Sequence, residues 1–242
     1  METSRGSTSN KITLATAVIL GVTVAFVYLH FKENNNPPLP DWAPAPISAE
    51  AQLLMDAIQE GELSQAGKLV RRFPELIEYI YPEYGTPVHL AAAVDDAEMV
   101  EMLLEMGARL EPGGRWGGSP LHLAAWAGSH HAVKTLLARG ANPNSRCEMF
   151  SATPLLWAAH GSGEAPGAGS NYIRIAEMLL AAGASADTHN SSGQSALSMA
   201  SPELAEFLRR NGASDDRDSP ARSNARRPIV SQKESIESVG WR

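Results

Sequence analysis

The chain has 242 residues, of which 43% are hydrophobic and 19% charged, an ordinary composition for a globular protein of one or two domains. Residues 47–214 carry 19 acidic and 11 basic side chains, which argues against a nucleic-acid groove, because phosphates are neutralised by lysine and arginine. The single cysteine, Cys147, excludes stabilisation by an intramolecular disulfide.

A long apolar run lies near the N-terminus. Residues 12–31, "ITLATAVILGVTVAFVYLHF", contain no charged side chain unless His30 is protonated. As a helix at about 1.5 Å per residue the run would be roughly 30 Å long, which is the thickness of a bilayer's hydrocarbon core. We therefore predict a single-pass transmembrane helix at residues 12–31, after a short tail at residues 1–11.

Two other interpretations of this run stay open. It can be a secretory signal that is cleaved near Ala25, with Arg5 and Lys11 as its basic start, or a buried helix. The same two basic residues precede the run and Lys32 follows it, so the positive-inside tendency favours a cytoplasmic N-terminus. This two-to-one excess does not decide the side of the membrane on which the main domain lies.

The next segment, residues 32–48, contains five prolines and three asparagines. Proline lacks an amide donor and favours extended conformations, so we predict a semi-rigid linker between the apolar run and the main domain.

A pattern then occurs three times with a period near 33 residues. Each copy has a Thr-Pro or Ser-Pro start, an Ala-Ala pair and a Gly-Ala stop. The starting prolines are Pro87, Pro120 and Pro154, and the stops are Gly107, Gly140 and Gly183. This period, with the T-P-L-H-x-A start, resembles the ankyrin repeat over roughly residues 49–214. The resemblance implies an all-α solenoid of helix-turn-helix units with hairpin loops, preceded here by the predicted transmembrane helix.

Each part of the pattern has a physical reason. The hydroxyl before each proline can cap the first helix, and proline tolerates the first helical position. The Ala-Ala pairs let neighbouring repeats approach closely, and Val133, Leu136 and Leu137 form the apolar stripe of a second helix. One unit cannot cover its own apolar face, so stability comes from stacking.

The ends and one insertion depart from this pattern. We count about five units, with residues 51–80 and 193–214 as atypical caps. The third full repeat carries an insertion at residues 162–171, rich in glycine and serine, which predicts a protruding loop between its helices. Residues 215–242 have few large apolar residues and are predicted to be a disordered tail.

The sequence offers little chemistry. The family resemblance implies that His89 and His122 hydrogen-bond loop backbone. His130 and His131 are adjacent, which predicts diverging side chains, and they lack a nearby carboxylate or cysteine to complete a site. We expect no enzyme, no cofactor and no metal. The competing hypothesis is a metal- or thiol-dependent activity centred on these two histidines and Cys147.

The resemblance implies that a partner is held by the hairpin tips and the exposed side of the first helices. Trp157 stands at an inward position and is predicted to be core. The candidate contact residues are Trp126, Trp116, Arg115, Asp95, His160 and Phe150.

These features together predict a membrane-anchored, monomeric ankyrin-repeat module that binds another protein. Seven acids and one base lie between Glu83 and Glu111, which would attract a basic segment of that partner. The alternative is a secreted or periplasmic soluble ankyrin protein, released by cleavage near Ala25, that acts as an effector or accessory factor.

Overall fold

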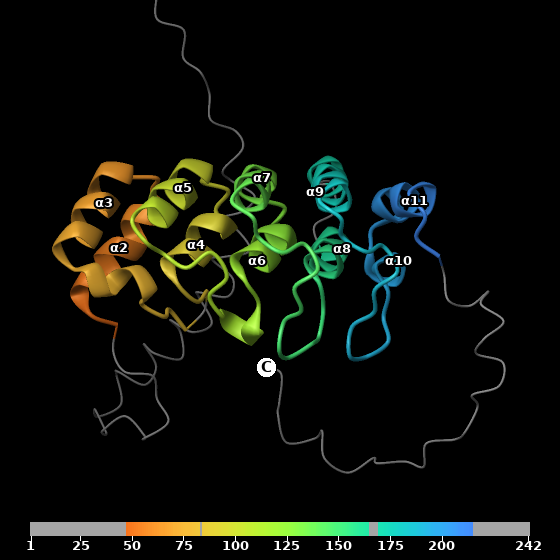
Figure 1. Ribbon diagram of the computed structural model, residues 1–242, viewed down its shortest axis with the longest axis horizontal. Helices are drawn as coiled ribbons and strands as arrows, with labels where there is room; N and C mark the ends of the chain where they lie inside the picture. The colour runs from red at the N-terminus through yellow and green to blue at the C-terminus, as the bar shows by residue number, and fades with distance from the viewer. Residues whose placement is uncertain (1–46, 83, 165–168, 215–242) are drawn as a thin grey trace, which may run out of the picture. The chain divides into compact units, whose positions relative to one another are not determined.

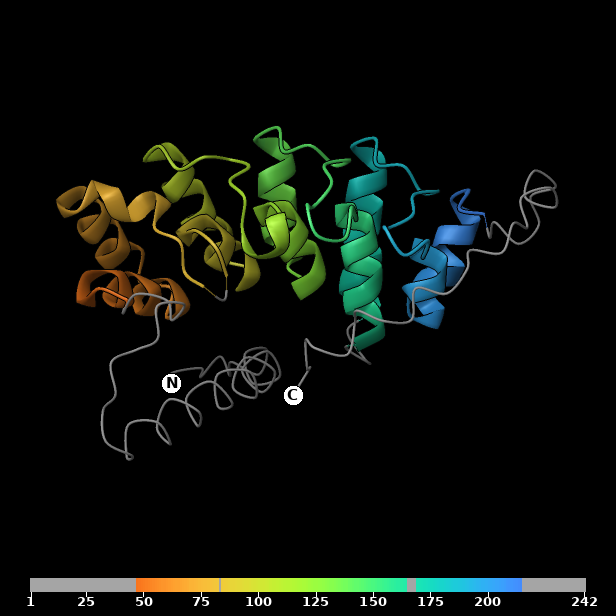
Figure 2. The ribbon, with the colours of Figure 1, turned by 90° about the horizontal axis from the view of Figure 1, so that it is seen from below.

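The computed structural model describes residues 47–214, apart from residue 83 and residues 165–168 (Figures 1 and 2). Within these residues the chain is helical, and the only β-pairing is two isolated antiparallel bridges. The helices are α2 (Ala49–Gln59), α3 (Leu63–Arg72), η1 (Pro74–Glu78), α4 (Pro87–Ala93), α5 (Ala97–Glu105), η2 (Arg115–Gly117), α6 (Pro120–Ala127), α7 (His130–Ala138), α8 (Pro154–Glu164), α9 (Gly169–Ala181), α10 (Ala196–Met199) and α11 (Pro202–Arg210).

The α-helices of this region are stacked as consecutive pairs in two rows (Figures 1 and 2). The first helices of the pairs, α2, α4, α6, α8 and α10, contact one another in sequence. The second helices, α3, α5, α7, α9 and α11, form the other row. This is the predicted all-α stack of helix-turn-helix units, in which each pair covers the apolar face of its neighbour.

The repeated residues have the predicted local roles. Helices α4, α6 and α8 each begin at the proline of the Thr-Pro or Ser-Pro start. The Ala-Ala pairs are fully buried between neighbouring first helices. Val133 and Leu136 are fully buried on the inner face of α7. Gly140 follows α7 with φ 92°, a left-handed conformation that favours glycine. Short-range sequence signals therefore determine where these helices begin and end.

The first helix pair is fastened to the loop that follows it. The hydroxyl of Tyr81 donates a hydrogen bond to the carbonyl oxygen of Ala51 in α2, at 2.8 Å, and the Tyr81 side chain is fully buried. Burial raises the pKa of this phenol, so its hydroxyl stays a donor at any physiological pH. This contact joins α2, the first helix of the N-terminal unit, to the loop before α4.

The prediction of a loop over the whole insertion at residues 162–171 was wrong, because residues 162–164 and 169–171 are helical, whereas residues 165–168 lie outside the described residues. Helix α8 continues to Glu164 and α9 begins at Gly169, so most of the extra residues lengthen the two helices. The hydroxyl of Ser162 donates to Ala159 and accepts from the amide of Ser201 in the next repeat. A contact with the next repeat thus helps to hold Ser162 in helical conformation, against the weak helix propensity of serine.

The segments predicted on either side of the repeats lie outside the described residues. These are the transmembrane helix at 12–31, the tail at 1–11, residues 32–46 of the linker, and the disordered tail at 215–242. Among the helices of the described region, none combines the length and the apolar character needed to cross a bilayer. The structure therefore gives no support to the predicted membrane span, which stays a prediction.

Candidate partner-binding surface

Three loops between successive repeats extend to the same side of the helices (Figure 1). We call them fingers one, two and three, and they are residues 106–119, 139–153 and 182–195. Their tips are joined by backbone hydrogen bonds. The Met149 amide donates to the Trp116 carbonyl at 3.2 Å, and the Ser191 amide donates to the Phe150 carbonyl at 2.7 Å. The fingertips therefore form one connected surface and not three independent loops.

Aromatic side chains gather where fingers one and two meet the first helices. The ring of Trp116 lies 5.9 Å from that of Trp157 and 6.4 Å from that of Phe150, centroid to centroid. Trp157 also makes an edge contact with His122 at 5.6 Å. Trp157 is 8% exposed, which confirms its predicted place in the core. Trp116 and Phe150, two of the candidate contact residues, are thus brought together.

The tip of finger two presents apolar surface. Met149 is 59% exposed and Phe150 is 38% exposed, and Trp116 beside them is half-buried. The backbone of Trp116 has φ 58°, a left-handed conformation that is uncommon for a bulky residue. Met149 was missed by the sequence analysis, although an adjacent Met-Phe pair in a polar loop was a usable signal. Arg115 belongs to the short helix η2 of finger one, but its side chain lies outside the description.

Trp126 and His160 form a second group, toward the other end of α6 and α8. The indole Nε1 of Trp126 donates to Glu164 at 3.2 Å, and the His160 Nε2 lies 3.3 Å from the other oxygen of the same carboxylate. The hydroxyl of Tyr172 in α9 donates to the Trp126 carbonyl at 2.9 Å. Glu164 was not foreseen, because it lies in the insertion that was predicted to be a loop.

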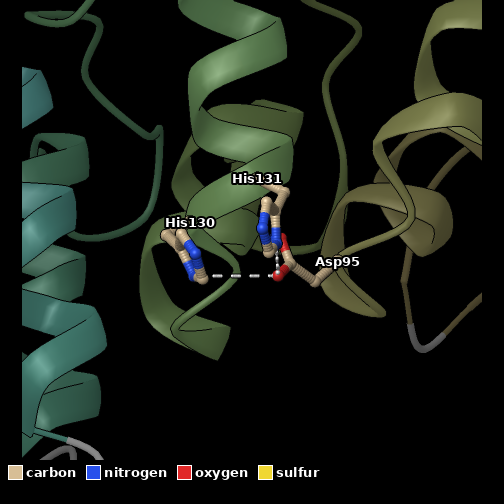
Figure 3. A group of neighbouring side chains, drawn as sticks. All are labelled: Asp95, His130 and His131. Carbon is tan, nitrogen blue, oxygen red and sulfur yellow. Dashed lines mark hydrogen bonds and ion pairs between the residues drawn. The ribbon is translucent and has the colours of Figure 1, made fainter.

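Asp95 lies between repeats, with His130 and His131 of the following repeat (Figure 3). Its Oδ2 is 2.8 Å from the Nδ1 of His131 and 3.9 Å from the Nδ1 of His130, and its Oδ1 accepts from the Ala132 amide. The two imidazole rings lie 3.9 Å apart, centroid to centroid. The predictions that these histidines diverge and lack a carboxylate were both wrong, because the carboxylate comes from another repeat.

His89 and His122 have the structural role that the resemblance implied. Each Nδ1 accepts the backbone amide of the residue three positions earlier, Thr86 or Ser119, at 3.1 Å. Each Nε2 therefore carries the proton and donates to a finger carbonyl, Gly118 or Ala152, at 3.0 Å. Burial lowers the pKa of both imidazoles to about 4, so both are neutral at pH 7.

Cys147 does not belong to any cluster of metal-ligating side chains found in the described part of the chain. Its side chain is 2% exposed, and its amide donates to the carbonyl of Ala152 within finger two. A thiolate nucleophile needs access to its substrate, which this burial denies. The structure therefore separates Cys147 from His130 and His131, with which it was grouped in the competing hypothesis.

The acidic run from residue 83 to residue 111 is largely used in contacts between repeats. Glu101 and Glu105 both pair with Arg139 of the next repeat. Asp96 caps its own helix, α5, by accepting the amide of Met99, and Glu111 accepts the amide of Asn142. Such engaged carboxylates attract a basic partner less strongly than the bare count of charges suggests.

Comparison with known proteins agrees with this architecture over part of the chain. Residues 54–147 match a family model described as ankyrin repeats, in three copies. No curated protein matches the chain. The helix pairs α8–α9 and α10–α11 lie beyond the matched residues but continue the same two rows. The first of these pairs has Leu156 in place of the histidine and carries the lengthened helices.

Proposed function

Taking residues 54–147 as ankyrin repeats, a module for protein–protein interaction, we propose that this chain is a membrane-anchored protein that binds a partner through its fingers and catalyses no reaction. The observation that supports this choice of binding surface is the exposed apolar tip of finger two beside Trp116. Binding energy in protein interfaces concentrates in a few apolar and aromatic residues that become buried on association.

The shape of the surface supports this choice over the second group at Trp126. Met149 and Phe150 project from a tip whose backbone is fastened to fingers one and three. The guanidinium of Arg146 adds hydrogen bonds to the carbonyls of Ser151 and His189, which join fingers two and three. A tip fastened in this way loses little conformational freedom on binding, so more of the contact energy appears as affinity.

Substitution at the tip tests the binding surface. We expect Phe150→Ala to weaken partner binding roughly tenfold, because it removes a ring that a partner would bury. The partner is first identified by cross-linking the full chain in its native membranes and by mass spectrometry, and its affinity is then measured for each variant. Leu53→Ala is the matched control, because Leu53 is an apolar side chain of 48% exposure on α2. Equal losses for the two variants, or none for either, would rule out this surface.

We also propose that residues 12–31 hold the chain in a membrane, with residues 32–48 as the linker to the repeats. The length and apolar character of the run support this proposal. We expect the full chain to stay with membranes at alkaline pH, and a variant without residues 12–31 to be released. A soluble chain whose mature N-terminus lies near Ala25 would instead establish the secreted alternative.

The side of the membrane can be found in the same preparation with an introduced thiol. Ser192 is exposed at the tip of finger three, whereas Cys147 is buried and should react with a maleimide only after denaturation. In Ser192→Cys, labelling of intact cells by an impermeant maleimide would place the repeats outside, as a cytoplasmic N-terminus predicts. Labelling that requires opened membranes would place them inside.

A further inference from the structure

A buried nitrogen of His130 has no hydrogen-bond partner. Among the residues that the structure describes, the Nδ1 of His130 is the one buried side-chain nitrogen or oxygen for which none is found. The Oδ2 of Asp95 lies 3.9 Å away, which is too long for a hydrogen bond. Buried polar atoms in folded proteins are nearly always paired, so this atom needs an explanation.

Helix capping explains the position of the Asp95 carboxylate but not the orientation of the His130 ring. The Oδ1 of Asp95 accepts the amide of Ala132 in the first turn of α7, and Oδ2 contacts His131 at 2.8 Å. The cap residue of α7, Ser129, makes no side-chain cap of its own, so Asp95 replaces it from the preceding repeat. This arrangement would be complete without His130, whose ring nonetheless turns its Nδ1 toward the same carboxylate (Figure 3).

The backbone holds the carboxylate in this place. Asp95 follows the end of α4 with φ 60°, a left-handed conformation that aspartate tolerates better than most residues. The Ser129 hydroxyl donates to the carbonyl of Ala93 at 2.9 Å, which fixes the start of α7 against the end of α4. The three side chains therefore converge from two repeats whose backbones are joined at this point.

The spacing of the three ligand atoms suits a tetrahedral metal ion. One ring nitrogen from each of His130 and His131 and a carboxylate oxygen of Asp95 all lie within 4.8 Å of one another. Ligands at about 2.0–2.2 Å from a tetrahedral zinc ion are about 3.4 Å apart. The distances of 2.8 Å and 3.9 Å from Oδ2 to the two nitrogens lie on either side of this value.

From this convergence we propose that Asp95, His130 and His131 bind a divalent transition-metal ion, with Zn²⁺ as the ion that two imidazoles and one carboxylate suit best. The 64% exposure of the His131 side chain leaves the fourth coordination position open to water. The bound ion joins the turn after α4 to the start of α7. It therefore stabilises the contact between two successive repeats, and this role is independent of partner binding at the fingers.

One cation near the site limits its affinity. Arg174 on α9 is close enough to His130 to oppose a positive charge there, whereas Asp95 favours one. The ligand set carries a single negative charge, so we expect a moderate dissociation constant, below about 100 μM. Arg174→Gln removes the opposing charge and should tighten zinc binding several-fold.

Zinc titration of the purified full chain, without a polyhistidine tag and after treatment with a chelator, tests the proposal. We expect one zinc ion per chain by calorimetry, and a thermal unfolding midpoint that rises with zinc concentration. His130→Ala should weaken zinc binding at least about tenfold. Even the loss of a residue that only hydrogen-bonds a metal ligand lowers metal affinity by about that factor. Asp95→Asn keeps an oxygen to cap α7 but loses the charge, so it should fold normally and bind zinc weakly.

The matched control is His160→Gln. His160 pairs with Glu164 at 3.3 Å, a histidine–carboxylate contact of the same kind within α8, and its loss should leave the titration unchanged. The circular dichroism of each variant without zinc shows that it is folded. The proposal is overturned if the native chain binds no zinc at 1 mM. It is equally overturned if His130→Ala and Asp95→Asn bind as the native chain does, or if His160→Gln removes the binding.

Discussion

Lowering the pH from 6.5 to 4 should remove about 3 kcal/mol of unfolding free energy for each of His89 and His122. Burial holds the pKa of both imidazoles at about 4, against 6.5 in an unfolded chain. Between pH 6.5 and pH 4 these histidines are protonated in the unfolded chain but stay neutral in the folded chain. The contribution is therefore fully present above pH 6.5 and is lost as the pH falls toward 4.

Burial is the largest cause of the low pKa, because a charged imidazolium would lose its hydration, and the hydrogen bond at Nδ1 also favours the neutral ring. Each Nδ1 accepts a backbone amide at the start of a first helix, and a protonated ring would have to turn a donor toward that amide. The donor at Nε2 joins the helix to the carbonyl of a finger. Protonation therefore breaks the bond at Nδ1 that fixes the ring at the start of the helix, whereas the Nε2 donor to the finger is kept.

Urea denaturation of the full chain at several pH values, with a chelator present, measures this effect. The slope between pH 6.5 and 5 should be about 2 kcal/mol per pH unit for the two histidines together. His122→Leu, which copies Leu156 of the next repeat, should lower stability at pH 7 but reduce that slope by about half. A slope that is unchanged in both His122→Leu and His89→Leu would show that these histidines are not its source.

Gly161→Ala should destabilise the chain by about 3 kcal/mol, the upper part of the usual range for overpacking. A Cβ on Gly161 would lie 2.1 Å from the carbonyl oxygen of Trp126 and 3.0 Å from the hydroxyl of Tyr172. The first contact is with backbone, which cannot rotate away as a side chain can. Helices α8 and α6 would have to separate, and the hydrogen bond from Tyr172 to Trp126 would be lost.

The control for this substitution is Gly169→Ala in α9. A Cβ at Gly169 meets nothing closer than 3.9 Å, so alanine there should be neutral or stabilising by roughly 0.5–1 kcal/mol through its better helix propensity. Urea midpoints of both variants of the full chain, followed by circular dichroism at pH 7, give the comparison. A Gly161→Ala chain as stable as the native one would refute the close approach of α8 to α6.

The two predictions differ in how far the sequence alone could have led to them. The capping histidines were predictable, because His89 and His122 stand three residues after a Thr or Ser that precedes a proline. The close approach at Gly161 was not, because it depends on a carbonyl in the preceding repeat. A glycine-rich insertion looks locally like a loop, and only the packed neighbours reveal that α8 continues into it as far as Glu164.

The candidate partner-binding surface was likewise predictable from the sequence only in part. The sequence indicated Trp116 and Phe150 separately, as aromatic residues in two loops, but not that their rings lie 6.4 Å apart. It indicated Asp95 as a residue exposed for a partner, whereas the structure engages this carboxylate with His131, 36 residues later. Loop conformations and side-chain rotamers decide such contacts, and both depend on the packing of neighbouring repeats.

By itself the sequence determined the repeat, its period, the starts of its first helices and its buried alanines. These features arise from capping, backbone propensity and apolar spacing, which act over a few residues along the chain. The tertiary structure alone decided the length of α8, the joined fingertips and the convergence of Asp95 with His130 and His131. Each of these depends on atoms from two repeats, and their relative positions follow from how the stacked helices pack.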